Sequence, residues 1–204
     1  LPRGAPHLIG SGRGHAPVDA RDAQPVRLAE LAQVRYGGDG DATLLACGWF
    51  AFERNVPNPL LAALPRAFRV ALGDRPAGPW VEQSIRYALQ EAASGQPGSS
   101  AMAARVAESL FLETLRGYLE ALPPQERGWL AGLRDPQVGR CLALMHAQPA
   151  RAWSLELLAQ ESYTSRSVLA ERFSELLGTP PMQYLKRWRL AMAARMLATE
   201  RVNV

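Results

Sequence analysis

The sequence predicts an α+β protein in which β structure is followed by a helical hairpin and an all-α helix-turn-helix domain. Three observations predict this class. Short apolar runs separated by Gly- and Asp-rich turns fill residues 1–72, whereas apolar residues at helical spacing dominate from residue 80 onward. The stretch 73–79 is rich in Gly and Pro and separates the two patterns. We therefore expect three segments, at 1–78, 79–134 and 135–204.

Composition limits the classes of protein to which the chain can belong. It has 204 residues, 48% of them apolar, and a formal net charge of +4. This apolar fraction is enough for folded cores, and the modest basic excess permits nucleic-acid binding without demonstrating it. No apolar run approaches the ~20 residues that span a bilayer, and no signal peptide is visible. We expect a cytoplasmic protein without membrane contact.

The N-terminal segment contains short runs with the pattern of β-strands. They lie at 7–9, 26–28, 43–47, 49–52 and 66–72. These strands are too few to close a barrel or sandwich by themselves. Before the last run, Pro57, Pro59 and Pro65 bracket a short helix at 60–64.

Residues 80–122 have the pattern of a helical hairpin. Its two helices are expected at 80–93 and 99–122, separated by a break that contains Gly95 and Gly98. The second helix has more apolar residues than one face requires, because Met102 and Leu112 lie off its main stripe. The surplus fits two interpretations: contact with a second copy of the chain, or packing within its own domain.

A supporting helix is expected ahead of the helix-turn-helix. After a short helix at 125–133, Asp135 and Pro136 have the cap and first-position arrangement with which helices begin. The apolar residues of the new helix share one face, and Pro149 ends it. We expect this helix to support the two helices that follow.

Residues 154–178 have the pattern of a helix-turn-helix. Ser154 and Ser165 are candidate N-caps of two short amphipathic helices, and Gly178 is a stop signal for the second. Glu156 lies in the first turn of the first helix, where a negative charge is favourable. Two such helices with a three-residue turn between them are typical of this DNA-binding motif, although an ordinary helical hairpin has the same spacing.

The exposed face of the second helix has the chemistry needed to read DNA. A recognition helix contacts base edges with three or four side chains near its N-terminus. Arg pairs with guanine, Glu accepts from cytosine, Ser bonds bases or phosphates, and Ala contacts the thymine methyl group. The candidate DNA-binding residues are therefore Ser165, Arg166, Ser167, Ala170 and Glu171.

A longer helix is expected at 180–198, with Thr179 as its candidate N-cap. At ~1.5 Å per residue it is nearly ~30 Å long, close to the separation of adjacent major grooves on one face of DNA. Its basic residues lie away from its apolar stripe and are suited to contact phosphates. We include Arg187 among the candidate DNA-binding residues.

The pattern of these two regions resembles the first helix-turn-helix and linker helix of AraC-type transcription regulators. The matching residues are Ser165-x3-Leu169-x3-Phe173-x4-Gly178-Thr-Pro180-x3-Tyr184-Leu185, followed by Arg189 and Met196-Leu197. One departure is Tyr163, which stands where that family usually has a small residue in the turn. A positive φ there would cost Tyr free energy.

The N-terminal segment resembles the cupin-like sensor of such regulators. Pro2-x-Gly4-x-x-His7 is similar to the second cupin motif, and residues 44–52 and 58–65 are similar to the end of that sensor. This resemblance implies a partial cupin-like β-barrel or sandwich at 1–78. It also implies a chain truncated at both ends, because the first cupin motif and a second helix-turn-helix are missing.

Together, the resemblances imply a DNA-binding regulator and not an enzyme. They imply a homodimer that couples a small-molecule effector to double-stranded DNA, with no cofactor. His7 is a candidate ligand-binding residue of the sensor. The three His residues and two Cys residues lack the spacing of a metal site, so no metal is expected.

Two alternatives remain. The chain could be an interaction or dimerisation module that does not bind DNA. It could also be a cupin metalloenzyme, which would require a set of metal ligands that the sequence does not display.

Overall fold

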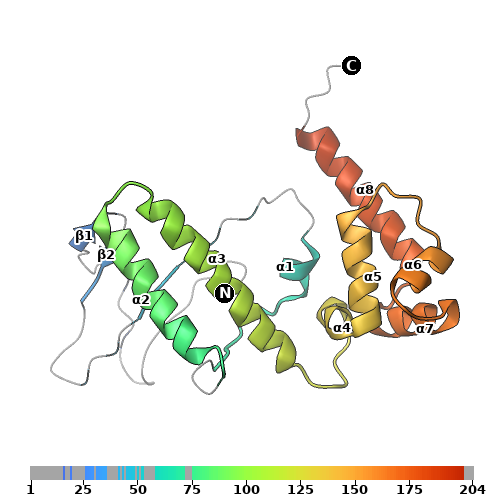
Figure 1. Ribbon diagram of the computed structural model, residues 1–204, viewed down its shortest axis with the longest axis horizontal. Helices are drawn as coiled ribbons and strands as arrows, with labels where there is room; N and C mark the ends of the chain where they lie inside the picture. Colours follow the sequence, from blue (N-terminus) through green and yellow to red (C-terminus); the bar gives the residue numbers. More distant parts are fainter. Residues whose placement is uncertain are drawn as a thin grey trace. The chain divides into compact units, whose positions relative to one another are not determined.

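The computed structural model describes residues 16, 19, 26–29, 31–35, 41, 43, 45–48, 50, 52, 58–71 and 75–199. The chain divides into two compact units (Figure 1). One contains 1–3, 51–68 and 119–204, and we call it the helix-turn-helix unit; the other contains 4–50 and 69–118. In the described part of the chain, no helix combines the length and the apolar character that a membrane span requires.

The predicted α+β class with a partial cupin-like barrel or sandwich is wrong: the described residues are mostly helical. They contain one pair of strands, β1 (Val26–Leu28) and β2 (Leu31–Gln33), which run antiparallel with Val26 opposite Gln33. Where residues 43–47 and 66–72 are described, they do not form strands. A strand requires a neighbour for its backbone hydrogen bonds, and no described segment supplies one.

The alternating pattern near residue 70 has a different origin. Val70 is half-buried, whereas Arg69 and Ala71 are exposed. Val70 packs on Gly117 of α3 (Ser99–Glu120) so closely that a Cβ at Gly117 would lie 2.7 Å from Val70 Cγ1. The segment therefore alternates because it lies against a helix and not because it belongs to a sheet.

The predicted helical hairpin is confirmed as α2 (Gly78–Ser94) and α3. The connection between them begins at Gly95, whose φ of 63° favours glycine. The pair β1–β2 packs against α2. Val81 and Leu115 are the buried apolar residues of the two helices. Four large apolar residues of α2 and α3 are exposed: Trp80, Tyr87, Met102 and Leu112.

The described residues of the helix-turn-helix unit form six helices. They are α1 (Pro59–Ala63), α4 (Trp129–Arg134), α5 (Pro136–Ala147), α6 (Leu155–Glu161), α7 (Arg166–Leu177) and α8 (Pro181–Thr199). Each was predicted from the sequence: α1 from the prolines that bracket it, α4 as a short helix at 125–133, and the other four from apolar spacing and capping residues. The largest difference is at α4, which begins after Gly128, where φ is 103°. The fully buried core comes from α5, α6, α7 and α8 and includes Met145, Leu158, Leu169, Phe173 and Leu185.

The short helix α1 packs against α4 within this unit. Asn58 caps it by accepting a hydrogen bond from the Leu61 backbone N–H at 3.1 Å. Leu64, just beyond its last turn, is only 2% exposed. Leu64 is therefore a buried residue of the helix-turn-helix unit, whereas α1 itself contains no buried residue.

Candidate nucleic-acid interface

The turn between α6 and α7 contains a non-glycine residue in the left-handed region. Tyr163, the residue that departs from the resembling family in this turn, has a φ of 55°. This conformation costs an L-residue about 1–2 kcal/mol. The turn is closed by the Thr164 backbone N–H, which donates to the Ala159 carbonyl at 3.0 Å.

Arg140 of α5 supports this turn. Its guanidinium carbon lies 4.5 Å from the centre of the Tyr163 ring, within the range of a cation–π contact. Its Nη2 donates to the Tyr163 hydroxyl at 3.3 Å, and its Nε donates to the Glu161 carbonyl. The supporting helix therefore holds the turn through one side chain.

The rotation of α7 is set by its caps and its buried face. Ser165 Oγ accepts from the Val168 backbone N–H at 3.3 Å, and Gly178 ends the helix with a φ of 68°. Leu169 and Phe173 are completely buried. Because this face points into the core, the opposite face of the N-terminal half points to solvent. The predicted residues Ser165, Arg166, Ser167 and Glu171 are exposed, and Ala170 is half-buried.

Arg166 is paired with a carboxylate of the preceding helix. Its Nη1 donates to Glu156 Oε1 of α6, and both side chains are more than half exposed. Hydrogen bonds from the Glu156 backbone N–H and from Arg166 lower the pKa of Glu156, so this side chain is ionised at neutral pH. Exposed ion pairs contribute little to stability, so phosphates or bases can compete for Arg166.

Asp135 joins α5 to α7. Its Oδ1 accepts from the Gln137 and Val138 backbone N–H groups at 3.0 and 2.9 Å, which caps α5. Its Oδ2 accepts from Nε and Nη2 of Arg172 on α7. The same carboxylate therefore caps the N-terminus of α5 and holds α7 against that helix.

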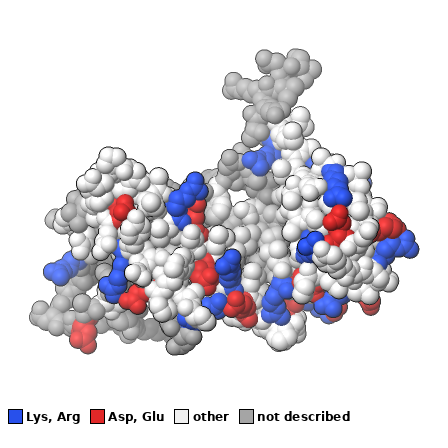
Figure 2. All heavy atoms as spheres, in the orientation of Figure 1, with Lys and Arg blue, Asp and Glu red and all other residues white. Residues whose placement is uncertain are grey.

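The basic residues of α8 differ in the hydrogen bonds and ion pairs that they make. Arg189 donates to the backbone carbonyls of Pro149 and Arg151 at 2.7 and 2.6 Å, so it has a structural role. Lys186 and Arg187 are exposed and have no hydrogen-bond or ion-pair partner among the described residues. In Figure 2, basic and acidic side chains alternate on the visible face of this unit and do not form one basic patch.

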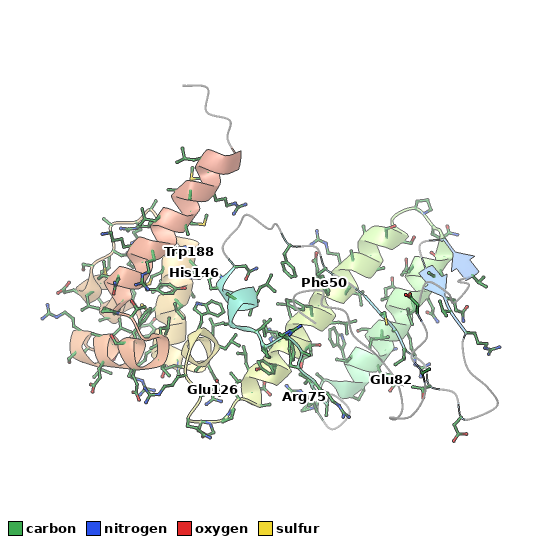
Figure 3. All side chains as sticks on the ribbon, turned by 180° about the vertical axis from the view of Figure 1, so that it is seen from behind. Phe50, Arg75, Glu82, Glu126, His146 and Trp188 are labelled. Atoms are coloured by element: carbon green, nitrogen blue, oxygen red, sulfur yellow. The ribbon has the colours of Figure 1, made fainter. Side chains whose placement is uncertain are left out.

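A polar aromatic cluster connects α4, α5 and α8. The Tyr184 hydroxyl accepts from Trp129 Nε1 at 2.9 Å and lies 2.8 Å from His146 Nε2. The His146 and Trp188 rings lie side by side between α5 and α8 (Figure 3). Burial lowers the pKa of His146 and raises the pKa of Tyr184, so both are neutral at neutral pH.

The structure brings five of the six predicted DNA-binding residues together on α7 and its cap, whereas Arg187 lies on α8. His7 lies outside the described residues. Within the described ranges, no group of three His, Cys, Asp or Glu side chains is arranged to hold a metal.

Sequence reasoning missed the partners of these residues. Glu156 is ten positions from Arg166, and Asp135 is 37 positions from Arg172, so no helical spacing links them. It also missed the aromatic cluster. The one available signal was the spacing of Tyr184 and Trp188, which are four residues apart and so share a helix face.

Comparison with protein families identifies a family to which the N-terminal part of the chain is similar. A family model described as cupin matches residues 1–120, a range that includes α2 and α3. No solved structure matches the chain.

The chain is also similar to curated regulators. It is 38% identical over 160 residues to a protein of Streptomyces lividans described as an AraC-like transcription regulator, covering 78% of this chain and 52% of that protein. It is 29% identical over 153 residues to the HTH-type transcriptional regulator AlkR of Acinetobacter baylyi, covering 74% and 50%. It is 28% identical over 167 residues to the RCS-specific HTH-type transcriptional activator RclR of Escherichia coli, covering 81% and 58%. The chain spans about half the length of these relatives.

Proposed function

The chain belongs to the AraC-like transcription regulators that contain a cupin domain, and we propose that it binds double-stranded DNA through the N-terminal half of α7. The observation that carries this proposal is the orientation of α7. Buried Leu169 and Phe173 fix the helix from one side, and Arg166, Ser167 and Glu171 are exposed on the other. A recognition helix requires this arrangement of a rigid support and a polar N-terminal face.

Each exposed residue has a role that its chemistry supports. Arg166 pairs with guanine, Glu171 accepts from cytosine, and the Ala170 methyl contacts thymine. Ser165 and Ser167, at the N-terminus of the helix, bond phosphate or base edges. To read a base, the Arg166 guanidinium must leave the Glu156 carboxylate and pair with the base instead.

Residues of α8 provide contacts that do not depend on sequence. Arg187 and its neighbour Lys186 are exposed and unpaired among the described residues, so they are available to phosphates. The 19 residues of α8 extend for about 29 Å, close to the distance between adjacent major grooves. We propose that α8 lies along the DNA backbone.

The remaining parts of the proposal concern regulation. The protein acts in the cytoplasm as a homodimer, without catalysis, and its N-terminal part responds to a small-molecule effector. Dimerisation is supported by the exposed apolar residues of α2 and α3, among them Trp80 and Leu112, which are 48% and 54% exposed. Two-fold partners are also what helix-turn-helix readers generally need.

The test is DNA binding measured by fluorescence anisotropy on duplexes selected from a random pool. We expect affinity to fall steeply with salt, and Arg166→Ala to cost about 1–3 kcal/mol on selected duplexes while relaxing the preference at one base pair. Arg105→Ala, an exposed change on α3, is the control. Affinity that does not respond to salt, or equal effects of the two variants, would reject the proposal.

A second candidate function is an interaction module that does not bind DNA. It is favoured by one observation: Arg166 and Arg172 are already paired with carboxylates, and the visible charges are mixed in sign. A stable dimer that shifts no duplex at about 50 mM salt would support this alternative.

A further inference from the structure

We propose that the helix-turn-helix unit contains a binding site for a small aromatic carboxylate, in a pocket between α1, α4 and α8. The pocket has a volume of about 350 Å³, and all its lining residues belong to this unit. Volumes of about 300–1,000 Å³ are typical of small-molecule sites. The site is separate from the exposed face of α7.

The walls of the pocket favour a flat apolar body. Trp129 of α4 and Tyr184 and Trp188 of α8 contribute aromatic rings, and Pro59 of α1 closes another side. The rings are held in place, because Tyr184 is hydrogen-bonded to Trp129 and His146 stacks on Trp188. Rigid aromatic walls bind a planar ring by stacking, with little loss of side-chain freedom.

The polar groups at the pocket favour an anion. Arg187 lines it, is exposed and has no partner among the described residues. Trp188 also lines it, but its Nε1 is buried and has no hydrogen-bond partner among the described residues, so the indole contributes ring surface to the pocket and not an accessible donor. The Arg187 guanidinium is therefore the group at the pocket that favours an anion.

None of the described lining residues has an acidic side chain that would neutralise Arg187. The other hydroxyls at the pocket are already engaged: Thr179 donates to Gln183 Oε1 at 3.1 Å, and Tyr184 belongs to the aromatic cluster. The ligand that fits these residues therefore carries negatively charged acceptor oxygens next to an aromatic ring. A carboxylate fits a guanidinium in two-point geometry, which a neutral amide does not reproduce.

The experiment compares 2-naphthoate with 2-naphthamide by isothermal titration calorimetry on the 204-residue chain. The two probes have the same ring and nearly the same shape but differ in charge. We expect naphthoate to bind at least about tenfold more tightly, because a charge-assisted hydrogen bond contributes about this factor. Equal affinities, or no binding of either probe at about millimolar concentration, would overturn the proposal.

Variants locate the site. Arg187→Gln should abolish the preference for naphthoate, whereas Lys186→Gln makes the same charge change at the adjacent residue, which does not line the pocket, and should keep it. Trp188→Phe keeps a ring against His146 but removes part of the aromatic wall, so both probes should bind more weakly by a similar factor and the preference for naphthoate should remain. If the preference survives Arg187→Gln, or disappears equally in Lys186→Gln, the ligand does not occupy this pocket. Arg187 is on the surface, so this variant does not depend on refolding of the core.

Discussion

The imidazole of His146 stacks on the indole of Trp188, with ring centroids 4.2 Å apart and an angle of 8° between the planes. This contact joins the supporting helix α5 to α8. The Tyr184 hydroxyl has one proton, and Trp129 already donates to its oxygen. Since no described acceptor other than His146 is bonded to it, Tyr184 donates to His146 Nε2, and His146 carries its proton on Nδ1. The cluster is complete only while His146 is neutral.

We expect the stability of this unit to fall as the pH drops below about 6.5. Burial lowers the pKa of folded His146, whereas unfolded His has a pKa of about 6.5. The unfolded state therefore binds more protons in this window, and the free energy of unfolding decreases as pH falls. Tyr184 remains neutral here because burial raises its pKa. Urea denaturation at about pH 7.5 and about pH 5 measures the change.

Two variants separate the effect of protonating His146 from the effect of its packing contacts on stability. His146→Phe keeps the stack but cannot titrate, so its stability should change less between the two pH values. Tyr184→Phe keeps His146 buried, so it should lose about 1 kcal/mol at both pH values and retain the pH dependence of the parent chain. A parent chain and a His146→Phe variant with the same pH dependence would contradict this assignment.

Local signals in the sequence predicted the helices of this unit well. Ser154, Ser165 and Asp135 act as caps, and Gly178 ends α7, because capping depends on residues a few positions apart. The exposed face of α7 followed from the spacing of its buried residues in the same way. The family resemblance pointed to Tyr163 as the turn residue, but the positive φ of that residue was known only from the structure.

Contacts between distant residues could not be predicted in this way. The pairing of Arg166 with Glu156 depends on how two helices cross, which no periodicity determines. The expected strand near residue 70 was wrong because period-two alternation indicates only that one side of an extended chain is covered. Here the cover is α3, with Gly117 under Val70, and not a second strand.

Asp135→Ala should destabilise the helix-turn-helix unit by about 2 kcal/mol. The substitution removes the cap of α5, which contributes about 1–2 kcal/mol, and also the acceptor of Arg172. Asp135→Asn keeps a side-chain oxygen for the cap and weakens only the pairing with Arg172, so it should cost about half as much. Urea denaturation compares the two, and equal losses would show that the cap is not the main contribution.

The effect of Tyr163→Gly should depend on Arg140. Glycine removes the cost of the left-handed conformation but also removes the cation–π contact, so the single substitution should change stability little. In an Arg140→Ala background there is no cation–π contact to lose, so only the relief of the left-handed conformation remains. Tyr163→Gly should then be more favourable than in the parent chain by about 0.5–1 kcal/mol. Thermal or urea denaturation of the four proteins measures this coupling. Additive effects would indicate that Arg140 does not support the turn.

Glu156→Gln should strengthen DNA binding. Glu156 holds Arg166 and places a negative charge beside the proposed reading face. Glutamine keeps the shape of the side chain but releases the guanidinium and removes repulsion of phosphates. We expect affinity to rise about two- to fivefold, which matches the strength of exposed ion pairs.

The control for this prediction is Glu175→Gln. Glu175 is also exposed and paired with an arginine, Arg127, but lies near the C-terminal end of α7, one turn beyond Glu171 and nine positions from Arg166. The two variants therefore change the net charge equally, and a general charge effect would raise affinity equally in both. The gain of Glu156→Gln should also shrink to that of Glu175→Gln when Arg166 is replaced by Ala, because there is then no guanidinium to release. The same duplex and anisotropy measurement are used in the Arg166→Ala background. If the full gain in affinity persists there, Glu156 weakens binding by repelling phosphates and not by pairing with Arg166.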